Sequence, residues 1–107
     1  MLEPLLGSAN SERVLMFIFA REAGYAREIA RFFGVSLTPI QKQLEKLEFG
    51  GVLVSRKIGR TRLYTFNPRY PFLDELKALL EKALLFYPEE QRERLIMYRR
   101  RPRHPAP

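Results

Sequence analysis

The stretch GVSLTPIQKQLEKLEFGG, residues 34–51, has the features of a capped amphipathic helix. Ser36 is the expected N-cap, and Pro39 falls in the first turn, where its missing N–H group has no helical partner to lose. Apolar residues spaced by four and three positions form a narrow stripe that we expect to be buried: Ile40, Leu44 and Leu47. The opposite face is polar and contains Thr38, Lys42, Glu45 and Lys46, flanked by Gln41 and Gln43. The partner of this polar face is the central question about the chain.

Two further helices are expected before residue 34. The first begins near Ser8, Asn10 or Ser11, each an acceptable cap, and extends to about residue 21 or 22. Its centre, VLMFIFA at 14–20, is apolar on every side, whereas a surface helix shows a single apolar stripe. We therefore expect this helix to pack on its own core and on a second surface. After Gly24, the segment YAREIARFFG at 25–34 predicts a short second helix.

Beyond residue 51 the period of the apolar residues changes from that of a helix to that of a strand. VLVSRKIGRTRLYTF, residues 52–66, predicts strands at about 52–57 and 62–66 around a turn at 58–61. Gly59 can supply the positive φ that such a turn commonly needs. NPRYP, residues 67–71, is expected to be an extended linker.

The last third of the chain predicts a leucine-rich helix at about 72–86. Its apolar residues alternate spacings of three and four, in a seam that is longer than a small core needs. Another helical stretch begins at Pro88. The segment RRRPRHPAP, residues 99–107, is basic and rich in proline, and we expect it to be disordered.

The charge of the chain is concentrated in two blocks. The net charge is +7, residues 25–66 contain eight Lys or Arg and three Glu, and residues 92–107 contain six Arg and one Glu. A solvated, soluble surface would also carry charges, but two basic blocks on a slightly acidic scaffold favour a polyanionic partner.

Several other classes of protein are disfavoured. The chain contains no cysteine, and its single histidine, His104, lies among prolines, so we expect no metal site, no cofactor and no enzymatic activity. The longest unbroken apolar run has seven residues and the N-terminus has no basic region ahead of an apolar stretch, so we expect no membrane partner, no signal peptide and a cytoplasmic location.

Two short helices joined by a Gly-x-Ser turn and followed by a two-stranded ribbon form a winged helix-turn-helix. EIARFFGVSLTPIQKQLEKLEFGGVLVSRKIGRTRLYTFNP, residues 28–68, resembles the winged-helix regulators of the ArsR type and, more loosely, of the MarR type. The resemblance covers roughly residues 8–87. It implies a mainly α (α+β) fold with a DNA-binding domain at 1–71, a C-terminal helical dimerisation segment at 72–98 and a tail at 99–107. Metal-sensing ArsR relatives carry cysteine or His/Asp clusters, which this chain lacks.

The resemblance implies a sequence-specific regulator of transcription that binds double-stranded DNA, as a homodimeric repressor reading a palindrome. The helix at 36–49 would enter the major groove, where Gln and Lys read base edges, and the wing would contact the backbone or the minor groove. The predicted DNA-binding residues are Arg27, Ser36, Thr38, Gln41, Lys42, Lys46, Arg56, Lys57, Arg60 and Arg62. Arg31 lies where the second helix would cross the backbone.

The predicted dimer interface combines the first helix and the leucine-rich helix, and contains Leu15, Ile18, Phe72, Leu76, Leu79, Leu80 and Ala83. Other interpretations stay open: the seam could close the core of one chain, and Arg56 and Lys57 could protect an edge strand from aggregation. Two alternative functions are a winged-helix protein-interaction module and an RNA-binding adaptor that uses the Arg-rich tail. The sequence identifies neither an operator nor an effector.

Overall fold

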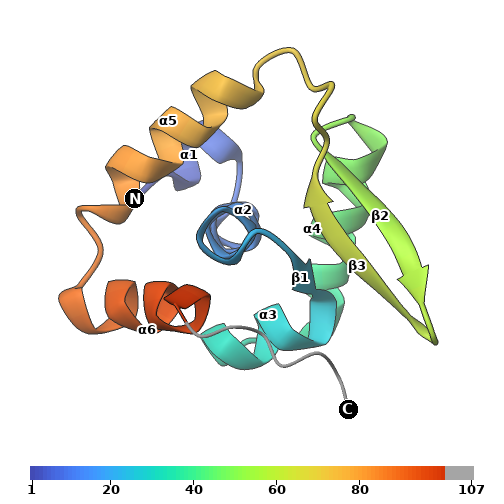
Figure 1. The fold of residues 1–107 in the computed structure, drawn as a ribbon, viewed down its shortest axis with the longest axis horizontal. Helices are drawn as coiled ribbons and strands as arrows, with labels where there is room; N and C mark the ends of the chain where they lie inside the picture. Colours follow the sequence, from blue (N-terminus) through green and yellow to red (C-terminus); the bar gives the residue numbers. More distant parts are fainter. Residues whose placement is uncertain (101–107) are drawn as a thin grey trace.

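The computed structural model describes the backbone of residues 1–100 and the side chains of residues 1–96. The elements, in chain order, are α1 (Glu3–Leu6), α2 (Ala9–Arg21), β1 (Gly24–Tyr25), α3 (Ala26–Phe33), α4 (Leu37–Phe49), β2 (Leu53–Ile58), β3 (Thr61–Phe66), α5 (Leu73–Leu84) and α6 (Glu89–Arg100) (Figure 1). The fold is mainly helical, with a three-stranded antiparallel sheet in the order β1-β3-β2. The expected winged-helix fold class is confirmed. None of the described helices combines the length and the hydrophobicity needed to cross a membrane.

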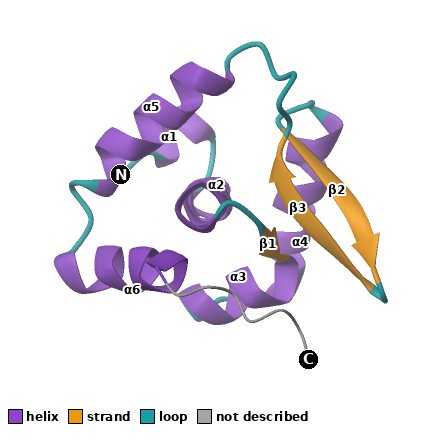
Figure 2. Cartoon of the chain, viewed as in Figure 1, coloured by secondary structure: helices purple, strands orange, loops and turns teal. Residues whose placement is uncertain are grey.

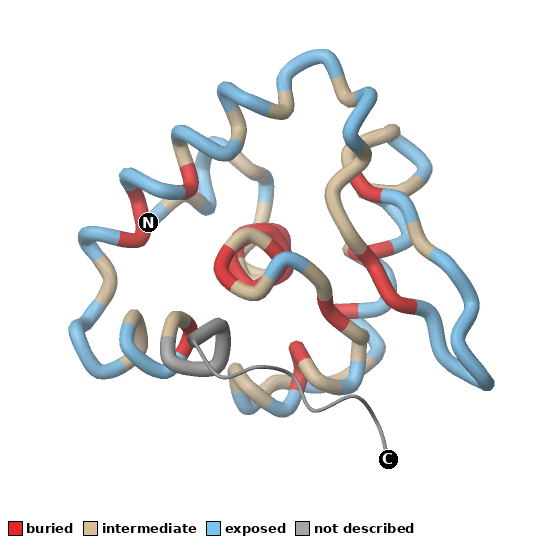
Figure 3. The backbone as a smooth tube through the Cα atoms, viewed as in Figure 1, coloured by how far each residue is buried: buried red, intermediate tan, exposed pale blue. Residues whose placement is uncertain are grey.

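Helix α2 is the centre of the molecule. Ser8 caps it, and the Ser8 hydroxyl oxygen accepts a hydrogen bond from the backbone N–H of Ser11 at 3.0 Å. Seen end-on in Figure 2, α2 lies inside a ring of the other elements, and Figure 3 shows its surface buried almost all round. Met16, Phe17 and Ile18 have no exposed surface. The second surface expected for this helix is therefore supplied by the same chain, through α4, α5 and α6.

Helices α3 and α4 form the helix-turn-helix. Gly34 ends α3 with a φ of +65°, and its N–H donates to the carbonyl oxygens of Ala30 and Arg31, which is a common helix end at glycine. Ser36 precedes α4 in an extended conformation, although its side chain makes no capping hydrogen bond. Ile40 and Leu44 are completely buried. The expected apolar stripe is thus confirmed, and the polar side of α4 faces away from the core.

Strands β2 and β3 form the wing. Ile58 pairs with Thr61, so the turn consists of Gly59 and Arg60. Gly59 has a φ of +61°, as a tight hairpin with glycine in its first central position requires. The wing is held at its base by Asn67, whose side-chain amide donates to the carbonyl oxygen of Gly51 at 2.9 Å.

The sheet has a third strand, β1, which was not predicted. Gly24 pairs with Tyr64, and Tyr25 pairs with Leu63. A Cβ atom on Gly24 would lie 3.0 Å from the Phe17 ring and 3.1 Å from Ile29. Only glycine therefore lets the two-residue strand approach α2 this closely.

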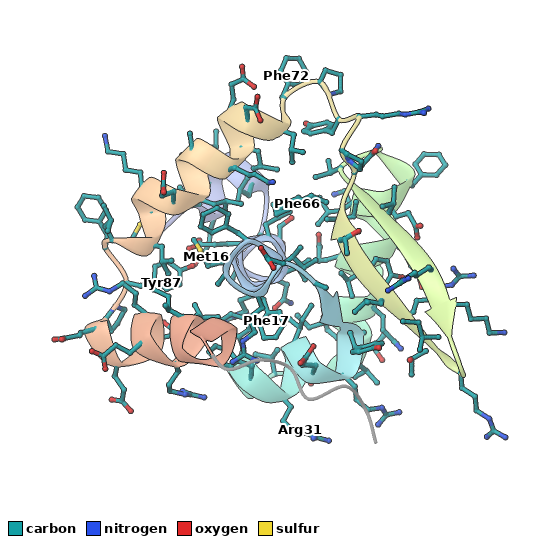
Figure 4. The ribbon with its side chains drawn as sticks, viewed as in Figure 1. Met16, Phe17, Arg31, Phe66, Phe72 and Tyr87 are labelled. Carbon is teal, nitrogen blue, oxygen red and sulfur yellow. The ribbon has the colours of Figure 1, made fainter. Side chains whose placement is uncertain are left out.

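Helices α5 and α6 complete the core around α2. Leu15, Ile18, Leu80 and Ala83 were predicted to lie at a dimer interface, but all four are buried inside this single chain. The prediction was wrong for them because it assigned to a partner the apolar surface that α5 and α6 cover. Leu76 and Leu79 are partly buried. Phe72 is 62% exposed and projects away from the body of the molecule (Figure 4).

The C-terminal boundaries also differ from the expectation. Helix α5 is shorter than the predicted range 72–86, and α6 includes Arg100, two residues beyond the expected end of the helical segment. Residues 101–107, which make up most of the predicted disordered tail, lie outside the described residues.

Candidate nucleic-acid interface

The outer face of α4 is polar and open to solvent. Because Ile40 and Leu44 turn one side of the helix toward α2 and α3, Gln41 and Lys42 are exposed, whereas Gln43 is half-buried and its Oε1 accepts a hydrogen bond from Ser11 Oγ at 3.3 Å. All ten predicted DNA-binding residues are exposed: Arg27, Ser36, Thr38, Gln41, Lys42, Lys46, Arg56, Lys57, Arg60 and Arg62. With respect to the side chains of residues 1–96, none of the Lys and Arg in this set makes an ion pair with a carboxylate.

A groove separates α4 from the wing. It has a volume of about 330 Å³, and α3, α4 and the hairpin each supply part of its lining. The structure brings together four of the predicted residues here: Arg27, Gln41, Arg60 and Arg62. Three guanidinium groups, the carboxylate of Glu45 and one amide that can read a base edge therefore line the same groove, with a net positive charge. This arrangement suits a strongly anionic partner that is recognised by its polar edges.

A hydrogen-bonded chain connects the wing to α4. Arg62 Nη1 donates to Ser55 Oγ at 3.3 Å, and Ser55 Oγ donates to Glu48 Oε2 at 2.8 Å. The chain attaches β2 to the end of α4 and orients Arg62 on β3. Sequence reasoning missed Ser55 and Glu48. The one indication in the sequence was that Ser55, a small polar residue, lies on the face of the strand that is opposite a polar face of the helix.

Tyr64 lies in the floor of the groove and is buried. Burial raises the pKa of the Tyr64 hydroxyl above its usual value, and the negative charges of Glu48 and Glu45 raise it further, while Arg62 opposes the shift. The hydroxyl therefore keeps its proton and remains available as a hydrogen-bond donor within the groove.

The register of the wing divides the remaining basic residues. Lys57 pairs with Arg62, whereas Arg56 pairs with Leu63. Because directly opposed residues lie on the same face of a ribbon, Lys57 shares the face of Arg62, and Arg56 lies on the other face. Arg56 is thus separated from the groove. Thr38, Lys42 and Lys46 lie outside the groove lining, on the exposed surface of α4.

The described side chains form no metal-binding cluster. Within residues 1–96, no group of three or more His, Asp or Glu side chains is placed to hold a metal ion.

Some apolar side chains near this interface are exposed. Phe49 ends α4 with 96% of its side chain exposed, and Val54 and Ile58 on β2 are also exposed.

The fold is similar to that of solved winged-helix regulators. A double mutant of ZitR from Lactococcus lactis, in apo form, matches with a TM-score of 0.55 at 18% identity over 84% of this chain and 76% of that chain. ZitR itself, a zinc-responsive MarR family member from Lactococcus lactis, matches with a TM-score of 0.52 at 16% identity over 85% of this chain and 70% of that chain. No protein-family model and no curated protein matches the sequence. At this level of identity the likeness establishes the winged-helix fold, and the neighbours are of the MarR rather than the ArsR type.

Proposed function

We propose that this chain is a sequence-specific regulator of transcription that binds double-stranded DNA. Helix α4 enters the major groove, and the wing contacts the backbone or the minor groove. The observation that carries the proposal is the groove between α4 and the wing, which Arg27, Gln41, Arg60 and Arg62 line beside an exposed polar helix face.

The side chains at the start of α4 match the chemistry of base edges. Gln41 can bond adenine through two hydrogen bonds, and Lys42 can reach the O6 and N7 atoms of guanine. Thr38 can contact a phosphate or a thymine methyl group. Lys46, one turn further on, is placed for the backbone, and Arg60 at the wing tip is placed for a narrow minor groove.

The similarity in fold to a MarR family member supports the same class of function. ZitR is described as zinc-responsive, and that property is not part of this proposal, because the chain offers no cysteine. An effector of this chain would act by chemistry other than the binding of zinc to cysteine.

We propose that the working unit is a homodimer that acts as a repressor. Phe72, Leu79 and Phe86 recur every seven residues along α5 and its ends, and two of them are more than 60% exposed. Leu5 of α1 is 68% exposed. The proposed interface therefore consists of Leu5, Phe72, Leu79 and Phe86, with the partly buried Leu76. It no longer contains the four core residues that were first expected there. A two-fold dimer would place two α4 helices about 34 Å apart and so read a palindrome.

The proposal is tested by footprinting the protein on the intergenic DNA upstream of its own gene, followed by fluorescence anisotropy on the protected site. We expect a protected palindrome and binding that is at least about a thousandfold tighter than binding to an unrelated duplex. Equal affinity for both duplexes would remove sequence-specific regulation and leave general nucleic-acid binding.

A second candidate function is a protein-interaction module, and the nearly complete exposure of Phe49 at the end of α4 favours it. In that case Phe49→Ala should abolish capture of a partner protein and leave the melting temperature unchanged. If the chain instead regulates transcription through DNA, Phe49→Ala should leave operator affinity within about twofold.

A further inference from the structure

A second pocket lies on the other side of Arg27 from the groove described above. It is formed by the end of α2, by α3, by α6 and by the wing tip, and has a volume of about 580 Å³. That volume falls in the range of small-molecule sites, about 300–1,000 Å³. We call it the arginine pocket, after four of the residues that line it: Arg21, Arg27, Arg31 and Arg94.

The arginine pocket is electropositive. Its lining contains these four guanidinium groups and one carboxylate, that of Glu28, whose Oε1 accepts a hydrogen bond from the backbone N–H of Tyr25. Four positive groups and one negative group leave the lining with a net positive charge, which favours an anionic ligand. The residues of the pocket come from segments that are far apart in the sequence, from Arg21 on α2 to Arg94 on α6.

Two of the arginines are held in place by aromatic rings. Arg21 stacks on Phe17 with its guanidinium carbon 4.6 Å from the ring centre, and it lies 4.9 Å from the centre of Phe32. Arg94 lies 4.7 Å from the same Phe32 ring. Arg21 Nη2 also donates to the backbone carbonyl of Arg94 at 3.3 Å, which joins α2 to α6.

These contacts organise the pocket in advance. Phe17 lies in the core (Figure 4), and Phe32 packs against it edge to face with the ring centres 5.6 Å apart, so the ring that contacts both guanidinium groups is held against the core. A guanidinium that lies over an aromatic ring is restricted in the positions it can adopt. Little side-chain freedom is then lost on binding, which favours affinity.

We propose that the arginine pocket binds a small organic phosphate, an anion in which the phosphate group is attached to a flat apolar group. The phosphate would contact the guanidinium groups of Arg94, Arg21 and Arg31, and the apolar part would lie against Phe32 and Tyr25. The pocket shares Arg27, Tyr25 and Thr61 with the groove beside α4. A ligand that fills the pocket therefore also lies against Arg27 and competes with DNA for it, an effect that rests on the proposed function.

A phosphate of the DNA backbone has the same charged group and is the other source to consider. A duplex is stiff and meets the exposed arginines of α3 without reaching Arg21, which is half-buried behind Phe32. An aromatic wall beside the half-buried Arg21 suits a small ligand better than a stiff duplex.

The test is isothermal titration calorimetry of the whole chain, without DNA, using phenyl phosphate, inorganic phosphate and phenol as probes. We expect phenyl phosphate to bind at least about tenfold more tightly than either other probe. Arg94→Gln should weaken that binding by about tenfold or more, because one charge-assisted contact is lost. The matched control is Arg69→Gln, an exposed arginine in the linker before α5 that should leave the affinity unchanged. Melting curves establish that both variants are folded.

The competition is then measured by anisotropy on the footprinted duplex. Phenyl phosphate should raise the apparent Kd for DNA of the wild-type chain, and Arg94→Gln should remove this effect while leaving DNA affinity without the probe unchanged. Equal binding of phenyl phosphate and inorganic phosphate, or equal losses in Arg94→Gln and Arg69→Gln, would overturn the site. The site would also be overturned if Arg94→Gln bound phenyl phosphate as tightly as the wild type but bound DNA more weakly. The pocket would then be a binding site for a phosphate of the DNA backbone. Probe binding without any DNA binding would overturn the proposed function and leave the site standing.

Discussion

In the proposed function, Gln41 and Lys42 would discriminate between bases, whereas Arg60 and Arg62 would provide general attraction to the duplex. Replacing Gln41 or Lys42 by alanine is expected to weaken binding to the preferred site by roughly 1–3 kcal/mol and to relax the base preference at one position, because a contact to a base edge is lost. Anisotropy titrations on a set of single-base variants of the footprinted site measure both effects.

Arg60→Ala serves as the contrasting variant. It should weaken all duplexes evenly and reduce the slope of log K against log salt by about one unit for the lost phosphate contact. A Lys42→Ala chain with unchanged affinity and unchanged base preference would show that α4 is not the recognition helix.

Glu12 is a buried carboxylate that joins three segments of the chain. Glu12 Oε1 accepts the backbone N–H of Leu2 at 2.7 Å, and Glu12 Oε2 accepts the hydroxyl of Tyr87. Burial by itself raises the pKa of Glu12, but the hydrogen bonds from Tyr87 and Leu2 outweigh it, so the pKa is lowered from 4.5. Burial and the same contact to Glu12 raise the pKa of Tyr87. The start of the chain and the link between α5 and α6 are both attached to α2 in this way.

We therefore expect Glu12→Gln to lower the free energy of unfolding by about 1–3 kcal/mol at neutral pH. Because the folded-state pKa is depressed, the contribution of Glu12 is present above pH 4.5 and is lost as the pH falls through the lower folded value. The difference in stability between wild type and Glu12→Gln, measured by urea unfolding, should shrink below pH 4.5. An unchanged difference at acid pH would contradict this account, and exposed Glu81→Gln is the control.

The wing is an element whose geometry depends on one backbone conformation. Gly59 has a φ of +61°, and a Cβ atom there would meet nothing within 4 Å. Gly59→Ala is therefore expected to strain the turn by roughly 1–2 kcal/mol without any steric clash. DNA affinity should fall because Arg60 and Arg62 are displaced, while the base preference set by α4 should be retained.

Gly50→Ala is the matched control for the turn variant. Gly50 has a φ of −79°, and its nearest neighbour to an added Cβ lies at 3.5 Å, an ordinary contact. Urea unfolding and anisotropy should show little change in this variant. Equal losses in both variants would mean that the conformation of the wing turn is not what positions the arginines.

The whole molecule completes its core without a partner, which changes how dimerisation must be tested. Leu80 has no exposed surface, so Leu80→Glu would unfold the chain whether or not it dimerises. Phe72 and Phe86 are 62% and 67% exposed and are suitable positions. The double variant Phe72→Glu, Phe86→Glu is expected to sediment as a folded monomer and to lose tight binding to the palindrome, because the apolar contact between subunits is lost.

Phe49→Glu places the same substitution on an exposed phenylalanine at the end of α4, and it should sediment as the wild type does. Sedimentation of the wild type as a 12.6 kDa monomer at micromolar concentration, with equal binding to a half-site, would end the dimer proposal.

Local patterns predicted the elements of the proposed DNA-binding face. The spacing of Ile40, Leu44 and Leu47, the glycines at helix ends and the change of period after residue 51 act within a few residues, so the helix-turn-helix and the wing could be located from sequence. The exposure of the predicted basic residues followed from the same periodicity, because the polar side of an amphipathic element is opposite its buried side.

Long-range packing decided the rest. An apolar helix has the same pattern whether its own chain or a partner covers it, so only the positions of α5 and α6 showed that Leu15, Ile18, Leu80 and Ala83 belong to one core. Strand β1 has two residues, too few for any periodic signal, and exists because β3 lies beside it. Cross-strand register placed Arg56 away from the groove, and Arg21 and Arg94, 73 residues apart, meet on Phe32 only because α2, α3 and α6 converge there. Contacts between distant segments depend on how the elements close around α2, and no local spacing contains that information.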